Sequence, residues 1–416
     1  MTKLQGVAGI GLRVLTSVYQ LKNQTCNMYR INTFQELMKG LPRGVFDQLV
    51  KKHQADKYSK HFGHWDQLVV MTYAQLSGTT GLRPLEASFN SHVAHHYHLG
   101  TGRIKRSTLA DANSRRGDTV FADAVTWLMQ KVARPLRQQS KELLYLLDST
   151  SITLKGREFD RWTLSNKTRN TQGVKLHILY AEQAQIPIWQ SISAANVNDV
   201  EKTKELPLQQ EVIYVFDKGY CDYNWWHRID MAGAQFVTRF KRNAGLRIEE
   251  ERSIPAEATD IVLQDQIVRF KNRHPGGKRI NQYEKPLRCI TVARADKPTP
   301  LVLATNDLNS DALTIARRYK ERWDIELFFK WIKQHLKIKQ FFGRTENAVR
   351  IQILTALISY LLVALYKQTH GLKQSLWECL CVIRATLFQR QDLEISQYRK
   401  RRREVEEMAR LQLGLF

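Results

Sequence analysis

Two short apolar runs, each followed immediately by an aspartate, constrain the fold of this chain more than any other feature. Residues 143–147 precede Asp148, and residues 212–216 precede Asp217. Such runs are typical of strands buried in a sheet that helices cover. Because ligands bind at strand ends in open α/β folds, a carboxylate held rigidly there suits a shared cation. Either aspartate taken alone is more commonly a helix cap or a turn former.

The segments around these runs predict a mixed sheet. The β-like segments are rich in β-branched and apolar residues, whereas two intervening segments have helical patterns. The resulting order is three strands, helix, strand, helix, strand, which describes an α/β fold with a mixed sheet covered by helices. Besides the two runs, the predicted strands cover residues 174–180, 186–192 and 236–240, and the helices cover residues 200–208 and 224–231.

Residues 245–308 depart from this order. β-like pieces at residues 259–268, 287–293 and 300–304 alternate with the turn-rich His274-Pro275-Gly276-Gly277, which predicts a strand-rich insertion. The pattern of residues 312–336 then predicts one long helix, with further helices up to about residue 390.

The predicted long helix gathers polar and aromatic residues on one face. At roughly 100° per residue, four of them, Tyr319, Arg322, Glu326 and Lys333, fall within about 60° of each other. One interpretation is a solvated stripe in which Arg322–Glu326 and Glu326–Lys330 pairs add a few tenths of a kcal/mol. The alternative is a metal-binding carboxylate flanked by cations that hold DNA phosphates, which the aromatic residues on the same face favour. The residues are Tyr319, Arg322, Trp323, Glu326, Lys330 and Lys333.

Residues 28–140 carry helical patterns separated by Gly and Pro. The short helix predicted over residues 104–116, with Ser107 as its N-cap, is flanked by basic residues. This helix suits a DNA groove or backbone, and a solvated surface helix explains it equally well. The candidate DNA contacts are Arg106, Arg115 and Arg116. The histidines at 92, 95, 96 and 98 match no zinc spacing and are expected to be solvated or to contact phosphate.

The charge of the chain bears on its partner. Sixty-four Lys and Arg against 40 acids give a formal net charge of +24, which favours a polyanion such as nucleic acid over other partners. Membrane surfaces and ribosomal RNA remain alternatives. The five scattered cysteines indicate no disulfide framework and fit a reducing cytoplasm. Residues 351–366 form the most apolar run, but it is shorter than the roughly 20 residues of a membrane-spanning helix, so a buried helix is expected.

The sequence resembles the insertion-sequence transposases that have a ribonuclease-H-like catalytic core, and within them the IS four family with its Tyr-Arg-Glu-Lys signature. Tyr319, Arg322, Glu326 and Lys333 have every spacing of that signature. The Ser/Thr-rich stretch that follows the first aspartate of the family is matched by Ser149-Thr150-Ser151 after Asp148. In the family, Gly and an aromatic residue follow the second catalytic aspartate, and Asp217-Lys218-Gly219-Tyr220 matches this pattern. The resemblance covers about residues 143–340, including a β-rich insertion before the glutamate.

The resemblance implies roles for these residues. Asp148, Asp217 and Glu326 would be catalytic and would bind two divalent metal ions, Mg²⁺ with Mn²⁺ as a substitute. Arg322 and Lys333 would contact terminal DNA phosphates, and Tyr319 would position the DNA end. Element ends would be nicked by hydrolysis, and the 3′-OH would then attack the target. Some relatives stack a flipped base on Trp; because residues 245–308 contain no Trp, the candidates here are Trp225, Trp226 and Trp323, each of which also suits the core.

The resulting expectation is a cut-and-paste DNA transposase that recognises terminal inverted repeats and target DNA. It would act as a dimer on DNA, without a membrane, in the bacterial cytoplasm in association with the nucleoid. A catalytically inactive DNA-binding protein and a structure-selective nuclease of the same fold are the alternatives. The expected organisation is a possible non-native leader (1–27), a helical DNA-binding domain (28–140), the first part of the catalytic core (141–244), the insertion (245–308), the rest of the core with Glu326 (309–345), and C-terminal helices with a basic tail that includes residues 399–403 (346–416).

Overall fold

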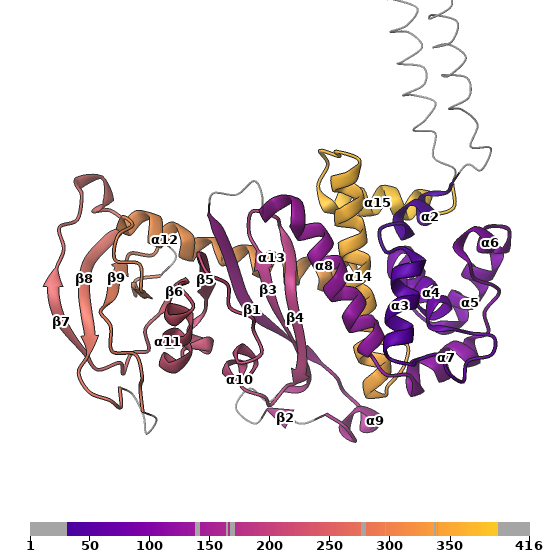
Figure 1. The fold of residues 1–416 in the computed structure, drawn as a ribbon, viewed down its shortest axis with the longest axis horizontal. Coiled ribbons are helices and arrows are strands. Elements are labelled where there is room, and N and C mark those ends of the chain that lie inside the picture. Colours follow the sequence, from indigo (N-terminus) through magenta and orange to yellow (C-terminus); the bar gives the residue numbers. More distant parts are fainter. Residues whose placement is uncertain are drawn as a thin grey trace, which may run out of the picture.

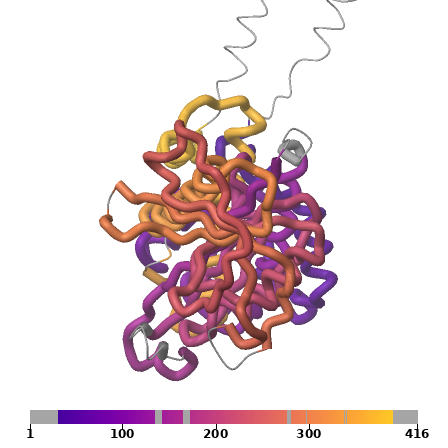
Figure 2. Tube along the Cα trace, turned by 90° about the vertical axis from the view of Figure 1, so that its left-hand side faces the viewer, coloured from indigo at the N-terminus to yellow at the C-terminus, as the bar shows by residue number. Residues whose placement is uncertain are grey.

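The computed structural model describes residues 31–389 except 138–141, 164, 167–170, 276–279, 296, 337 and 339. The predictions for residues 1–27 and for the basic patch at residues 399–403 therefore lie outside the described residues. Figure 1 shows the N-terminal helices at one end of the molecule, the central strands in the middle and strands β7–β9 at the other end. Figure 2, turned by 90°, has these last strands in front of the rest of the chain.

The central strands form one mixed sheet. Strand β1 pairs antiparallel with β3, and β3 pairs antiparallel with β4. On its other side β1 pairs parallel with β5, which pairs parallel with β6. The order β4-β3-β1-β5-β6 confirms the predicted mixed sheet. The strands are β1 (Leu143–Thr153), β3 (Thr171–Ala181), β4 (Ile186–Ala194), β5 (Val212–Phe216) and β6 (Gln235–Arg239), with the short β2 (Ser165–Asn166) beside β3.

Two helices lie between these strands in the chain, as predicted. Helix α10 (Asp199–Thr203) precedes β5, and α11 (Tyr223–Met231) precedes β6. The side chain of Asn198 caps the first of them by accepting the hydrogen bond from the N–H of Val200. Asp199 is instead buried.

The β-rich segment extends the central sheet and does not interrupt it. Its last strand, β10, pairs antiparallel with β6, and β9, β8 and β7 follow in order. The acidic strand β7 was not predicted, because three consecutive glutamates mask its strand character. These strands are β7 (Leu246–Glu251), β8 (Val262–Phe270), β9 (Leu287–Val292) and β10 (Leu301–Thr305).

The predicted single helix over residues 312–336 is two helices. Helix α12 (Ala312–Glu321) ends and α13 (Trp323–His335) begins on either side of Arg322. The backbone of Arg322 keeps right-handed helical angles, with φ −51° and ψ −24°. The polar face predicted for the continuous helix therefore carries over from Tyr319 into α13.

The remaining helices form the other end of the molecule. The prediction that Ser107 caps α7 is wrong, because that helix begins at Arg106 after Lys105. Smaller turns are η1 (Val93–His95), α9 (Arg157–Asp160), η2 (Lys218–Tyr220) and η3 (Ala256–Ala258). The helices are α2 (Thr33–Met38), α3 (Arg43–Lys52), α4 (His64–Ser77), α5 (Leu82–Ser91), α6 (His96–Leu99), α7 (Arg106–Arg115), α8 (Thr119–Arg137), α14 (Glu346–Thr369) and α15 (Leu376–Thr386).

Helix α14 forms the centre of this end of the molecule and packs against α4 and α8. It is longer than the predicted apolar run, because polar residues extend it at both ends. Among the described residues it is the one helix whose length and apolar composition would allow it to cross a membrane. Since 83% of its most apolar window is buried inside the protein, it is a core helix, as predicted.

Candidate active site

Asp148 lies in the middle of β1 and not at its end. Strand β1 continues to Thr153, and Asp148 pairs with Ile178 of β3. The expected strand end is nevertheless present on the other side, where parallel pairing with β5 stops at Leu147 and Phe216. Asp148 is therefore at the level where β5 ends and Asp217 follows. The antiparallel partner β3 keeps β1 extended beyond the end of β5.

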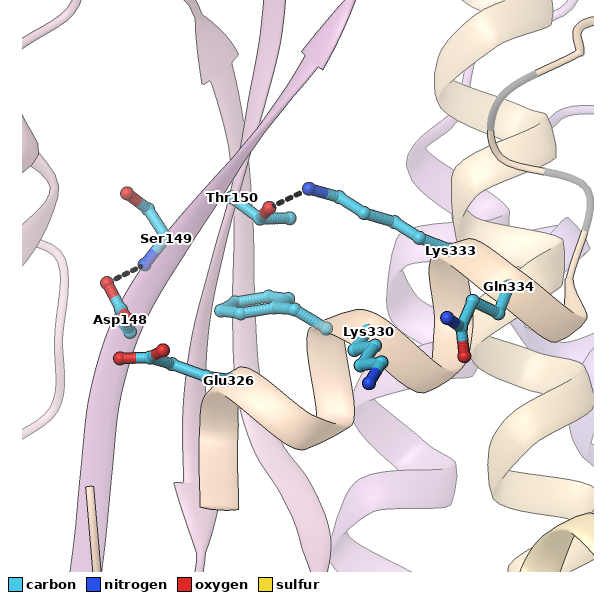
Figure 3. A pocket seen from close by; sticks show the side chains of 8 residues that line it. Asp148, Ser149, Thr150, Glu326, Lys330, Lys333 and Gln334 are labelled. Carbon is cyan, nitrogen blue, oxygen red and sulfur yellow. Dashed lines mark hydrogen bonds between the residues drawn. The ribbon is translucent and has the colours of Figure 1, made fainter. Parts of the chain in front are cut away.

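The face of β1 that carries Asp148 is covered by helix α13. Leu144 and Leu146, which share this face, belong to the same apolar core as Phe328 and Phe329 of that helix. Figure 3 shows Asp148 of β1 and Glu326 of α13 pointing toward one another. They lie in an open pocket with lysines further along the helix. The acid pocket, as we call it, is lined by Asp148, Ser149, Thr150, Glu326, Phe329, Lys330, Lys333 and Gln334.

The surroundings of Asp148 disfavour the charged form of its carboxyl group. Burial raises the pKa of Asp148 to about 6, and the carboxylates of Glu326 and Asp217 add to the increase. The N–H of Ser149, which donates to Asp148 at 2.8 Å, and the charge of Arg322 act in the opposite direction without cancelling it. The three acids are thus close enough to influence one another, although they come from distant parts of the chain.

Asp217 follows β5 directly and is held by two neighbours. It forms an ion pair with Arg239, at the end of β6, and the hydroxyl of Tyr319 donates to it at 3.5 Å. Burial by itself would raise the pKa of Asp217, but the hydrogen bond and charge of Arg239 hold it below its usual value. Arg239 was not predicted, because a single basic residue ending a strand has no sequence signature.

Arg322 connects the other two acids. Its guanidinium donates to Glu326 at 2.5 Å and to Asp148 at 3.4 Å, and it lies 5.9 Å from the ring centre of Tyr319. The Glu326 contact is the ion pair expected for a solvated helix stripe. The Asp148 contact, which crosses from helix to sheet, is not explained by such a stripe.

The other predicted residues of α13 lie beside the acid pocket. Lys333 donates to the hydroxyl of Thr150 on β1, Lys330 is exposed at the pocket, and the Trp323 side chain is 57% exposed. Trp225 and Trp226, by contrast, are buried in the apolar core between α11 and the sheet. Of the three tryptophans considered for base stacking, only Trp323 has an accessible ring.

The carboxylates of Asp148, Asp217 and Glu326 are suitable ligands for divalent metal ions, although in this structure they pair with arginines. Within the described parts of the chain, no three His, Cys, Asp or Glu side chains lie together as a ready-made metal site. Arg239 and Arg322 are bound to the carboxylates, yet the buried Nε of each has no hydrogen-bond partner. Three carboxylates, one of them with a raised pKa, are hard oxygen ligands of the kind that Mg²⁺ prefers. The residues thus fit such ions once the guanidinium groups move aside.

The predicted DNA contacts of α7 divide into two kinds. Arg106 and Arg115 are exposed, and Arg115 pairs with Asp111 on the same helix. Arg116 points inward instead, where it donates to Gln67 at 3.0 Å and to the carbonyl of Phe62. Its guanidinium is therefore used within the protein.

The histidine cluster also differs from expectation. His96 is buried and lies 3.0 Å from the carbonyl of Phe89 through Nε2, and its ring stacks on that of Phe89. His92 and His95 both stack on Phe388. The prediction of solvated histidines is therefore wrong for His96, whereas His92 and His95 are half-buried and His98 is exposed.

Comparisons with known proteins agree on one family. Residues 139–362 match the model described as the transposase DDE domain, and residues 30–102 match one described as a domain of unknown function. A Sinorhizobium fredii protein named as transposase y4zB is 38% identical over 287 residues, which are 68% of this chain and 78% of that protein. A Geobacillus stearothermophilus protein, named as a transposase for insertion sequence element IS5377, is 29% identical over 65% of this chain and 70% of its own.

A search of solved structures matched the piggyBac transposase synaptic complex with hairpin DNA. The match has a TM-score of 0.45 and 12% sequence identity, and it covers 86% of this chain and 81% of that one.

Proposed function

Because the chain belongs to the transposase DDE domain family, we propose that it moves an insertion sequence by cut-and-paste transposition, with Asp148, Asp217 and Glu326 as its metal ligands. Family membership makes it a DNA transposase, an enzyme that cleaves and transfers DNA strands with divalent metal ions. The proposal adds the residues, the number of ions and the pathway.

One observation carries the assignment of the site. Asp148 and Glu326 come from a strand and a helix far apart in the chain, yet they line the same pocket and share the guanidinium of Arg322. Asp217 accepts a hydrogen bond from Tyr319. Its negative charge also raises the pKa of Asp148, so it lies close to that residue. A solvated helix stripe would not require Glu326 to share a pocket and an arginine with an aspartate of the sheet.

We propose two Mg²⁺ ions, for which Mn²⁺ can substitute. A pair of such ions, when bound, activates the attacking oxygen and stabilises the leaving oxygen of a phosphodiester. The three carboxylates bind the cations, and their charges then no longer repel the DNA backbone. Arg322, released from Glu326, is well placed to contact a phosphate.

The other side chains around the acid pocket hold the DNA. Lys330 and Lys333 lie along α13 away from the acids, so they meet the phosphates next to the cleaved bond. The hydroxyl of Tyr319 donates to the carboxylate of Asp217 and thereby orients it. The exposed ring of Trp323 suits stacking on an unpaired base.

The proposed partners are the two ends of the element and the target DNA. Residues 28–140 would form the DNA-binding domain, with Arg106 and Arg115 of α7 as contacts. Because two ends must be joined in one event, we propose that a dimer assembles on DNA. We also propose that the protein acts in the cytoplasm on the chromosome of its host, where both DNA partners are found.

The test is a cleavage and strand-transfer assay on duplexes that carry the element ends, with Mg²⁺. Asp148→Ala should reduce cleavage by more than about 100-fold, since it removes a metal ligand, while binding of the ends persists. Asp260→Ala, which removes an exposed aspartate from the connection before β8, serves as the control and should cleave normally.

Two results would contradict the proposal. Unchanged cleavage by Asp148→Ala would mean that the site is wrongly assigned. Wild-type protein that cleaves ends but never joins them would be a structure-selective nuclease, and one that binds ends without cleaving them would be an inactive DNA-binding protein.

A further inference from the structure

A buried polar cluster lies on the opposite face of β1 from the acid pocket. This face is apolar at Tyr145 and Leu147, which pack with α11. Beyond Leu147 it becomes polar, although it stays covered by α10 and η2. Strand register places Ser149 opposite His177 and Ser151 opposite Lys175. We call Ser149, Lys175, His177, Ser193 and Asp199 the Asp199 cluster; its last four members are less than 9% exposed.

Asp199 is the acceptor at the centre of this cluster. One of its carboxylate oxygens accepts from Ser149 Oγ at 3.1 Å and from Lys175 Nζ at 3.0 Å. Lys175 also donates to the carbonyl of Val197 at 2.8 Å, so the start of α10 is fixed to β3. Ser149 directly follows Asp148, and its backbone N–H donates to the Asp148 carboxylate. Ser149 therefore connects Asp199 to Asp148.

The same cluster reaches the turn that carries Asp217. The second carboxylate oxygen of Asp199 faces Gly219, where a Cβ atom would lie 3.8 Å from it. The next residue, Tyr220, is buried, and its hydroxyl lies 3.5 Å from Nδ1 of His177. Nε2 of His177 is in turn 2.8 Å from the hydroxyl of Ser193. Asp199 therefore lies between the supports of two acids, one on β1 and one after β5.

Stability alone is a poor explanation for such a cluster. Removing Lys175 and Asp199 from water costs free energy that their attraction roughly offsets, so a buried ion pair contributes little compared with apolar residues. What the pair does provide is a fixed distance between the elements that it joins. The chain offers a comparison in Asp265 and Arg288, a pair that is equally buried in β8 and β9 but has no contact with the acid pocket.

We propose that Asp199 is a positioning residue that sets the spacing of Asp148 and Asp217, and thereby the affinity of the site for divalent metal ions. This inference rests on the proposed function. It goes beyond that function because Asp199 itself touches neither metal nor DNA; it acts through Ser149 and through the Gly219 turn.

The test measures Mn²⁺ binding to the whole chain by electron paramagnetic resonance, without reference to activity. Asp199→Asn should raise the Kd for Mn²⁺ by roughly 10- to 100-fold, the usual effect of losing a residue that orients metal ligands. Asp265→Asn, the matched control, should bind Mn²⁺ like the wild type even if it lowers the Tm. Ser149→Ala should weaken binding in the same direction, and Ser149→Thr, which keeps the hydroxyl, should restore it.

A second variant separates positioning from folding. Asp199→Asn leaves Lys175 as an unpaired buried cation, whereas Lys175→Met combined with Asp199→Asn removes both charges. We expect the double variant to be folded by circular dichroism and still to bind Mn²⁺ weakly. Wild-type affinity in the double variant, or the same Kd for Asp199→Asn and Asp265→Asn, would overturn the inference. A wild-type chain that binds no Mn²⁺ would overturn the proposed function, and this inference with it.

Discussion

At the scale of single residues, the molecule keeps three carboxylates together by pairing them with arginines. Arg239 pairs with Asp217, while Arg322 pairs with Asp148 and Glu326. The compensation is incomplete at Asp148, whose side chain is 21% exposed and whose pKa burial raises to about 6. Without metal, the negative charge of Asp148 therefore costs stability.

This cost leads to a prediction about pH. Because the folded state raises the pKa of Asp148, the carboxyl group favours folding at pH values below about 4, and this contribution is lost as the pH rises to about 6. Asp148→Asn removes the charge while keeping the shape. At pH 8 without metal, it should stabilise the chain by on the order of 3 kcal/mol relative to wild type.

The Tm of both proteins, measured at pH 4 and pH 8, checks this. The difference in Tm between Asp148→Asn and the wild type should be smaller at pH 4 than at pH 8. Added Mg²⁺ should raise the Tm of the wild type more than that of Asp148→Asn. A variant that is less stable than wild type at pH 8 would show that Arg322 compensates the charge fully.

Sequence patterns predicted the three acids but not the residues around them. Asp148, Asp217 and Glu326 each stand in a motif with fixed spacing, and Asp148 and Glu326 meet in one pocket. Arg239 and Asp199 stand in no motif of fixed spacing. Their contacts, with Asp217 and with Lys175, form only because the strands that carry these residues become neighbours in the sheet. Asn198 and Asp199 are both good caps by composition, so only the packing of α10 against β3 decides which is buried.

At the scale of elements, composition predicted the strands well, and pairing decided where they end. The apolar run before Asp148 predicted a strand ending there, but pairing with β3 carries β1 on to Thr153. The segment from β7 to β10 was expected as an insertion, yet it pairs with β6 and extends the sheet. Hydrogen bonding between distant strands is not visible in local patterns, which explains both differences.

Helix α7 is the element whose proposed DNA contact can be tested most simply. Arg106 and Arg115 are exposed, so Arg106→Ala and Arg115→Ala should each weaken binding to duplex DNA. Each should also reduce the slope of log K against log salt by about 1, because one phosphate contact is lost. Arg116→Ala should instead lower the Tm, since its guanidinium contacts Gln67 and Phe62.

Fluorescence anisotropy at several salt concentrations provides these slopes. Arg247→Ala, which removes an exposed arginine from β7 at the far end of the sheet, is the control and should leave the slope unchanged. If the two α7 variants behave like this control, α7 is a solvated surface helix.

At the scale of the whole molecule, the three regions follow one another along a single sheet. The helical end lies beside β4, the acids lie near β1 and β5, and the β-rich extension continues from β6 (Figures 1 and 2). The lysines of α13 extend from the acids toward the helical end (Figure 3). The formal net charge of +24 favours a polyanionic partner such as DNA.

We propose that Asp148, Asp217 and Glu326 together bind metal ions. The most direct measurement is anomalous diffraction from crystals of the protein soaked in Mn²⁺ with a duplex carrying an element end. We expect Mn²⁺ peaks in contact with carboxylate oxygens of all three residues, with Arg322 moved from Glu326 to a phosphate. Peaks that avoid Glu326, or an arginine that stays between Glu326 and Asp148 while DNA is bound, would contradict it.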